Sequence, residues 1–481
     1  MAAAREGRKS RFYDASKIDW DRLPFQDADL KALLVPLMLE QLLSSLMGMA
    51  DTMMVSRVGS AAISAVSLSD SINVLVIELF SALAAGGTIL CSQYIGSGRA
   101  KEANRAAEQV MLVCTVLSVA LAAVCFLARR PLLSFVFGTV EPDVMEASLT
   151  YFAVTSLSFP FIALYNAGAA FYRAGGNSKF PMQVSVFSNC LNIFGNAVFI
   201  FGFGWGVFGA ALSTLLSRIV CAAVIFAYLR RPKQIIVIRR YRVPPDLSMI
   251  GRILSVGIPS GIENSMFQFG KLAIQSSVST LGTTAIAAQA MAAIMETVNG
   301  VGAVGIGIGL MTVVGQCIGA GKPEEAKYYI VRHVRISEAV LIVSCLTVFA
   351  ITRPVTELAG MEPAAASLCL YMVGWITVFK PLFWVFSFSI AYGMRAAGDV
   401  RFSMITSSCT MWLCRVLLTT ILIRVLHFGP IAVWIGMFSD WGVRGLIFSH
   451  RFLSGKWLAH ALIGQGDAVE KTEKPGQNPA G

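Results

Sequence analysis

The heptapeptide Gln93-Tyr-Ile-Gly-Ser-Gly-Arg99 recurs later in the chain as Gln316-Cys-Ile-Gly-Ala-Gly-Lys322, at an offset of 223 residues (316 − 93). A second motif, Arg173-Ala-Gly-Gly176, returns as Arg395-Ala-Ala-Gly398 at an offset of 222 residues (395 − 173). Because the two offsets are nearly equal and the motifs are widely spaced, the repetition predicts two halves built on one structural plan.

The composition around these motifs is that of a membrane protein. Of the 481 residues, 56% are hydrophobic and only 14% are charged, whereas a soluble domain averages about 25% charged residues. Apolar runs of about 20 residues, the length that an α-helix needs to cross a bilayer, recur along the chain. The sequence therefore predicts an all-α membrane protein with about twelve transmembrane helices in two pseudo-symmetric six-helix lobes.

The apolar runs also place the expected spans and the boundaries between domains. We expect spans near 32–55, 62–90, 108–128, 148–171, 181–203, 206–229, 250–279, 284–313, 330–351, 366–392, 402–424 and 430–450. The domains that follow are a cytoplasmic N-terminal tail at 1–30, an N-lobe at 31–229, a cytoplasmic basic connector at 230–249, a C-lobe at 250–451 and a disordered cytoplasmic C-terminal tail at 452–481. Six spans per lobe give both lobes the same orientation in the membrane.

The net charge of +11 is explained by membrane topology rather than by nucleic-acid binding. Lys and Arg residues concentrate in the N-terminal tail, near Arg99, between Arg230 and Arg252, and near Lys322, which are alternate interhelix segments. This positive-inside pattern predicts a multi-pass protein of the inner membrane with both termini in the cytoplasm. The expected partner is the lipid bilayer, and no nucleic acid.

The repeated glycines could form phosphate-binding loops, but the surrounding residues do not fit such loops. Gln316 stands where the first glycine of a P-loop belongs, and Pro323 stands where Ser or Thr would bind Mg²⁺. The four histidines and ten cysteines show no metal-ligand spacing. We therefore expect capped turns at the glycines, no cofactor, no metal and no enzymatic activity, so that any transport would depend on an ion gradient.

Polar side chains inside the predicted spans are costly and therefore mark candidate functional positions. The first span carries a polar stripe on one helical face, with one carboxylate beside it: Gln41, Ser44, Gly48 and Asp51, with Glu40. The seventh span carries a similar stripe: Asn264, Gln268, Lys271 and Gln275. Both stripes predict a polar surface between the two lobes.

Carboxylates in such a surface are candidates for binding the coupling ion or a cationic substrate, because a desolvated carboxylate can hold a proton near neutral pH. Asp51 and Glu263 are the leading candidates, and Glu263 is related to Glu40 by the repeat offset. Glu296 in the eighth span is a further candidate, with Asp70, Glu78 and Asp440 less distinctive. The alternative is structural ion pairing, for example between Glu263 and Lys271.

Taken together, the motifs resemble the multidrug and toxic compound extrusion (MATE) family over about residues 30 to 450. The resemblance rests on Met49-Ala-Asp-Thr52 followed by Val58-Gly59, on the paired glycine loops, on Phe171-Tyr-Arg-Ala-Gly-Gly176, on Asn192 and Asn196, and on Gly257-Ile-Pro259. It implies two six-helix lobes around a cavity that opens alternately to either side. It also implies export of organic cations in exchange for H⁺ or Na⁺.

The same resemblance assigns roles to individual positions. Asp51 matches the acidic position of the first span, whereas Asn196 stands where many family members carry a second aspartate. Some members place an acidic residue near Phe267 or Gln268, where this chain has none, and Glu263 is our hypothesis for its substitute.

The favoured function is therefore an antiporter that exports small organic compounds, drug-like and cationic, by alternating access and acts as a monomer. One alternative is a flippase for lipid-linked precursors, which would need a strongly cationic cavity, and only Lys271, Arg415 and Arg218 are identified as cations that could supply it. A second alternative is a membrane receptor without transport activity.

Overall fold

The structure is a computed structural model that describes residues 12–138, 141–232, 234–238 and 243–463. Within these residues it is helical and contains no strand. The first half of the chain contains α2 (Asp27–Ser56), α3 (Ser60–Gly96), α4 (Ala100–Leu127), α5 (Arg129–Phe137), α6 (Pro142–Leu157), α7 (Phe159–Ala174), α8 (Lys179–Asn196), the π-helical segment η2 (Ala197–Gly202) and α9 (Gly206–Leu229). The second half contains α10 (Leu247–Val278), η3 (Ser279–Leu281), α11 (Thr283–Gly319), α12 (Pro323–Leu358), α13 (Pro363–Ala396), α14 (Val400–Thr410), the π-helical segment η4 (Met411–Leu417), α15 (Leu418–Arg424) and α16 (Ile431–Leu453).

Each predicted span coincides with a helix or with consecutive helical segments. Ten helices of the described part are long and apolar enough to cross a membrane, and the bent pair α6 and α7 makes an eleventh span. The pair bends by 43° where Pro160 follows the end of α6, because a proline ring excludes the hydrogen bond and the space that a straight helix needs. The remaining expected span is α10, which has 32 residues but a polar stripe that lowers its hydropathy.

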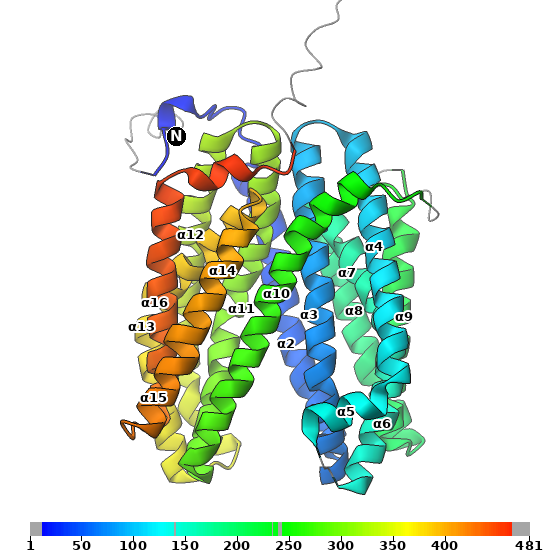
Figure 1. Ribbon diagram of the computed structural model, residues 1–481, viewed down its shortest axis with the longest axis vertical. Helices are drawn as coiled ribbons and strands as arrows, with labels where there is room; N and C mark the ends of the chain where they lie inside the picture. Colours follow the sequence, from blue (N-terminus) through cyan, green and yellow to red (C-terminus); the bar gives the residue numbers. More distant parts are fainter. Residues whose placement is uncertain (1–11, 139–140, 233, 239–242, 464–481) are drawn as a thin grey trace, which may run out of the picture.

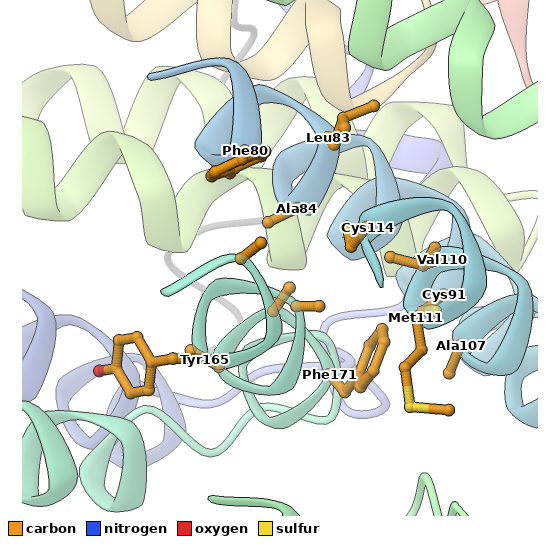
Figure 2. Close-up of a cluster of buried hydrophobic side chains, with 14 of the residues drawn as sticks. Phe80, Leu83, Ala84, Cys91, Ala107, Val110, Met111, Cys114, Tyr165 and Phe171 are labelled. Atoms are coloured by element: carbon orange, nitrogen blue, oxygen red, sulfur yellow. The ribbon is translucent and has the colours of Figure 1, made fainter. Parts of the chain in front are cut away.

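The helices form two lobes, with α2 to α9 in the N-lobe and α10 to α16 in the C-lobe. In Figure 1 the lobes meet at the upper end and diverge toward the lower end. Each lobe has its own buried apolar core. Figure 2 shows part of the N-lobe core, where Phe80 of α3, Val110 of α4 and Phe171 of α7 are packed with small side chains such as Ala84 and Ala107. The fold class predicted from the sequence is thus confirmed.

The two lobes approach most closely at the ends of α3 and α11. A β-carbon added to Gly96 would lie 2.0 Å from the carbonyl oxygen of Gln316, and one added to Gly319 would lie 1.9 Å from that of Gln93. No larger residue fits at either glycine without moving a backbone. The repeated glycines therefore let one end of the two-lobed structure close backbone against backbone.

The segments at both ends of the described chain lie on this closed end. Residues 12–26 pack on α12 of the C-lobe, where the hydroxyl of Tyr329 donates to the carbonyl oxygen of Phe25 (2.6 Å) and accepts from its amide (3.1 Å). At the other end, η5 (Lys456–His460) buries Trp457 completely, and the amide of Leu462 donates to Oε1 of Gln93 in the N-lobe (3.0 Å). Residues 452–463 are therefore ordered, contrary to the prediction of a disordered tail, because their aromatic and aliphatic side chains are buried. Residues 464–481 lie outside the described part.

Replacing Tyr329 with phenylalanine is expected to loosen the N-terminal segment from the C-lobe. The change removes one hydroxyl that satisfies two backbone groups, and each such hydrogen bond contributes about 1 kcal/mol. Hydrogen exchange of the Phe25 amide, measured by mass spectrometry, should accelerate by about tenfold or more. Unchanged exchange would show that the ring packing of Phe25 on α12 holds the segment without the hydroxyl.

Candidate functional site

The two repeated heptapeptides form equivalent turns that connect the lobes. Gly98 and Gly321 have φ angles of 73° and 71°, and the amides of Arg99 and Lys322 donate to carbonyl oxygens five residues earlier, each at 3.0 Å. This is the capped helix end that a glycine in the left-handed region permits. The expected capped turns are therefore present.

The side chain of the first residue in each heptapeptide reaches across to the other lobe. Nε2 of Gln93 donates to the carbonyl oxygen of Ala396 (2.9 Å), and Nε2 of Gln316 donates to that of Ala174 (2.8 Å). Each acceptor belongs to the second repeated motif of the opposite lobe. The two motifs that reveal the repeat are thus the two halves of one reciprocal contact, which sequence analysis did not foresee.

The arginine of the second motif pairs with a carboxylate within its own lobe. Arg173 donates both to Oε1 (2.8 Å) and to Oε2 (2.9 Å) of Glu40, and Arg395 donates to Oε1 of Glu263 (2.5 Å). Both carboxylates are buried. The ion pair considered between Glu263 and Lys271 is therefore wrong, because the helical face that carries Glu263 is turned toward α13 and Arg395.

Asp51 belongs to a polar cluster inside the N-lobe. Its carboxylate accepts a hydrogen bond from Nδ2 of Asn196, and Asn192 continues the chain of contacts by donating from Nδ2 to the hydroxyl of Thr214 (3.2 Å). The three predicted residues of α2 and α8 are thus brought together. Asn196 binds the carboxylate at the position where the family pattern has a second aspartate.

A second part of this N-lobe cluster surrounds Asp70 of α3. Its Oδ1 accepts from Nδ2 of Asn73 (3.1 Å) and from the hydroxyl of Tyr151 (3.3 Å). Arg218 of α9 is the nearby cation and donates to the hydroxyl of Ser158 (2.7 Å). Asn73 and Tyr151 were missed by the sequence analysis, because a single polar residue in an apolar helix gives no signal of its partner.

Two adjoining cavities separate the lobes away from the closed end. The outer one has a volume of about 430 Å³ and includes Asp70 and Thr52 in its wall, and the inner one has about 420 Å³. Gln268 and Lys271 line both. Of the predicted residues, the inner cavity also contains Gln41, Glu263, Asn264 and Glu296 in its wall.

The remaining predicted residues lie elsewhere. Asp51, Asn192 and Asn196 form the N-lobe cluster, and Glu40 is held by Arg173. Gln275 is exposed and belongs to neither of the two cavities. The polar stripe of the seventh span therefore reaches the cavities over Asn264 to Lys271 only.

The C-lobe wall contains more cations than the sequence analysis identified. Lys380 is fully buried and donates to Oε1 of Glu296 (2.6 Å) and to Oδ1 of Asn299 (2.5 Å). Arg444 is also buried and lies 3.4 Å from Asp440. The expectation that only Lys271, Arg415 and Arg218 could supply cations is thus wrong. Both missed residues lie inside predicted spans, so a closer count of charges within spans would have found them.

A helical membrane protein with two related lobes, a polar cavity between them and charged residues deep in that cavity has the architecture of a secondary transporter. The chain belongs to the MatE family, whose family model matches residues 36–198 and 259–421. The two matched segments are related by the same offset of 223 residues (259 − 36) as the heptapeptides.

The curated relatives are similar over most of their length. The chain is 28% identical to "Probable multidrug resistance protein NorM" of Thermotoga maritima over 92% of this chain and 96% of that protein. It is 26% identical to "Uncharacterized transporter YisQ" of Bacillus subtilis over 89% and 94% of the two chains. These relatives are named as transporters or resistance proteins and not as enzymes.

A solved structure shares the fold. The one titled "Outward-facing conformation of a multidrug resistance MATE family transporter of the MOP superfamily" superposes with a TM-score of 0.83 at 21% identity, over 89% of this chain and 96% of that chain. At this identity the likeness supports the two-lobed fold alone.

Proposed function

We propose that this protein exports small organic, drug-like compounds from the cell in exchange for inward-moving H⁺ or Na⁺, by alternating access between its two lobes. The observation that carries the proposal is the pair of cavities, which lie between lobes that are closed at one end only. The names of the relatives, which include "Probable multidrug resistance protein", support drug-like compounds as substrates.

The proposed orientation follows from the distribution of basic residues. The closed end carries Arg99 and Lys322, in segments that the positive-inside rule assigns to the cytoplasm. We place both termini and the closed end on the cytoplasmic side of the inner membrane, and we propose that the protein acts as a monomer. The cavities then open toward the outside, which is the state ready to release substrate and to receive the coupling ion.

We propose Asp51 as the carboxylate that binds the coupling ion. Asp51 and Asp70 act with Arg218 as the nearby cation, so this part of the N-lobe has one negative charge in excess. A proton or Na⁺ would neutralise that excess, and its binding would favour one arrangement of α2 and α8 over another. Glu263 is the less favoured candidate, because Arg395 already neutralises it.

Uptake of the fluorescent cation rhodamine 123 into inside-out vesicles, under an imposed proton or sodium gradient, tests this function. Asp51→Asn should lower gradient-driven uptake by about tenfold or more, since one ion-pair-strength interaction of about 1.4 kcal/mol corresponds to a factor of ten. Asp143→Asn, at an exposed carboxylate of α6, is the matched control and should transport as wild type does.

The results for wild type and Glu263→Gln decide between the alternatives. An unimpaired Asp51→Asn transporter together with an inactive Glu263→Gln transporter would move the coupling site to the C-lobe. If wild-type vesicles take up no rhodamine 123 under either gradient, the proposed function is contradicted, and the flippase and the receptor without transport activity become the better candidates.

A further inference from the structure

Arg415 is a buried cation without an ion-pair partner among the described residues. It belongs to η4, lines the inner cavity and is 9% exposed. Within the same part of the chain its Nε makes no hydrogen bond, and no carboxylate lies within ion-pair distance of its guanidinium. Because an unpaired charge away from bulk water is costly, its retention in the cavity wall suggests a ligand that completes it.

The packing around η4 holds Arg415 in place. A β-carbon on Gly270 of α10 would lie 2.2 Å from the methyl carbon of Met411, and one on Gly436 of α16 would lie 3.0 Å from the carbonyl oxygen of Arg415. The π-helical segment is therefore held between two helices that approach it closely. Single π-helical turns are frequent at functional sites.

Lys271 of α10 is the second cation of this wall that has no ion pair with a described residue. It is exposed to the two cavities and lies near enough to Arg415 for the two positive charges to interact. The carboxylates that act on this pair of cations are Glu78, Glu296 and Asp440. None of them lies within 4.0 Å of either cation in the described structure.

Those carboxylates are already used by other groups. Glu296 is paired with Lys380 at 2.6 Å, and Asp440 lies 3.4 Å from Arg444. Glu78 accepts from Nδ2 of Asn264 (2.9 Å).

The charges of the inner cavity do not balance. Its wall has four cations against three carboxylates: Lys271, Lys380, Arg395 and Arg415 against Glu78, Glu263 and Glu296. The ion pairs Glu263 with Arg395 and Glu296 with Lys380 leave two cations facing one carboxylate. One positive charge is therefore in excess.

We propose that Arg415 and Lys271 form a subsite for the anionic group of the transported compound, such as a carboxylate. A guanidinium presents paired N–H donors that match a carboxylate, and the neighbouring ammonium adds charge. The apolar part of the compound would lie against Phe267, Trp384 and Trp441 of the same cavity. This inference rests on the proposed function and narrows its substrates to amphipathic compounds that carry an anionic group in addition to any cationic one.

Equilibrium binding of two dyes that differ in one group tests the subsite. Rhodamine 110 has a free carboxylate, and rhodamine 123 is its methyl ester. Fluorescence anisotropy with the purified full-length protein in nanodiscs should show rhodamine 110 binding about tenfold or more tightly than rhodamine 123, since charge-assisted hydrogen bonds are the stronger ones. Arg415→Gln and Lys271→Gln should each reduce this preference toward one.

Two further variants separate a binding role from a structural one. Arg415→Lys should retain part of the preference, because it keeps the charge. Arg424→Gln removes an exposed cation of α15 that lines neither cavity and should keep the wild-type preference. If Arg415→Gln does not fold, Lys271→Gln at the exposed cavity wall decides the question.

The outcomes distinguish this inference from the proposed function. Equal binding of the two dyes by wild type, no binding of rhodamine 110, or an unchanged preference in both glutamine variants would overturn the subsite. Export of rhodamine 123 would still stand in those cases. Conversely, wild type that binds rhodamine 110 preferentially but transports neither dye would support the subsite and contradict the proposed transport.

Discussion

Gly319→Ala is expected to prevent the closed end of the two lobes from forming and thereby to stop transport. The added β-carbon would lie 1.9 Å from the carbonyl oxygen of Gln93, which is a backbone atom of the other lobe that cannot rotate away. Overpacking of this kind costs about 1–3 kcal/mol or more. The equilibrium between lobe arrangements should therefore shift by about tenfold to a hundredfold away from the closed end.

Two measurements check this expectation. Gradient-driven uptake into inside-out vesicles should fall by about tenfold or more, and hydrogen exchange of residues 93–99 and 316–322 should accelerate as the turns separate. Gly96→Ala should behave in the same way, because its β-carbon would meet the carbonyl oxygen of Gln316 at 2.0 Å.

Gly251→Ala provides the matched control. Gly251 lies in α10, and a β-carbon added to it would have no described atom of another residue within 4 Å, so alanine there should be tolerated. Wild-type transport by Gly319→Ala would mean that so close an approach of the two lobes is not part of the transport cycle.

Lys380→Met is expected to destabilise the C-lobe strongly. The ammonium of Lys380 is fully buried and donates to the carbonyl oxygen (2.7 Å) and Oε1 (2.6 Å) of Glu296 and to Oδ1 of Asn299 (2.5 Å). Removing one partner of a buried ion pair costs about 3–5 kcal/mol, because the other charge stays behind without compensation. The midpoint of thermal unfolding should fall by about 5 °C or more.

A double variant isolates the ion pair. Lys380→Met combined with Glu296→Gln should recover a large part of the loss, since no buried charge of this pair then remains unpaired. Lys327→Met is the control, because its pair with Glu324 lies at a half-buried surface position and such pairs contribute about 0–1 kcal/mol. A Lys380→Met protein as stable as wild type would show that Glu296 finds another partner, such as Lys271.

The all-helical membrane fold, the twelve spans and the twofold repeat could be predicted from the sequence, because each depends on local properties. Hydropathy over about 20 residues identifies a span without reference to its neighbours, and the spacing of Gln93 and Gln316 is visible in the chain itself. The capped turns at Gly98 and Gly321 were predictable for the same reason, since they form within one short segment.

The contacts between helices could not be predicted in this way. The offset relates Glu40 to Glu263 and Arg173 to Arg395, yet it does not indicate that each carboxylate pairs with the arginine of its own lobe. The same offset gives no sign that Gln93 and Gln316 each bond to the opposite lobe. Such partners are decided by which helical faces meet after packing.

By itself, the sequence determined that the chain crosses the membrane many times, is divided into two equivalent halves and carries polar residues within its spans. Only the tertiary structure decided which of these residues are neutralised by an ion pair, as Glu263 and Glu296 are, and which cation, Arg415, is left facing the cavity. The physical reason is that the cost of a charge in a membrane depends on its distance from an opposite charge. That distance is a property of packed helices and not of the order of residues along the chain.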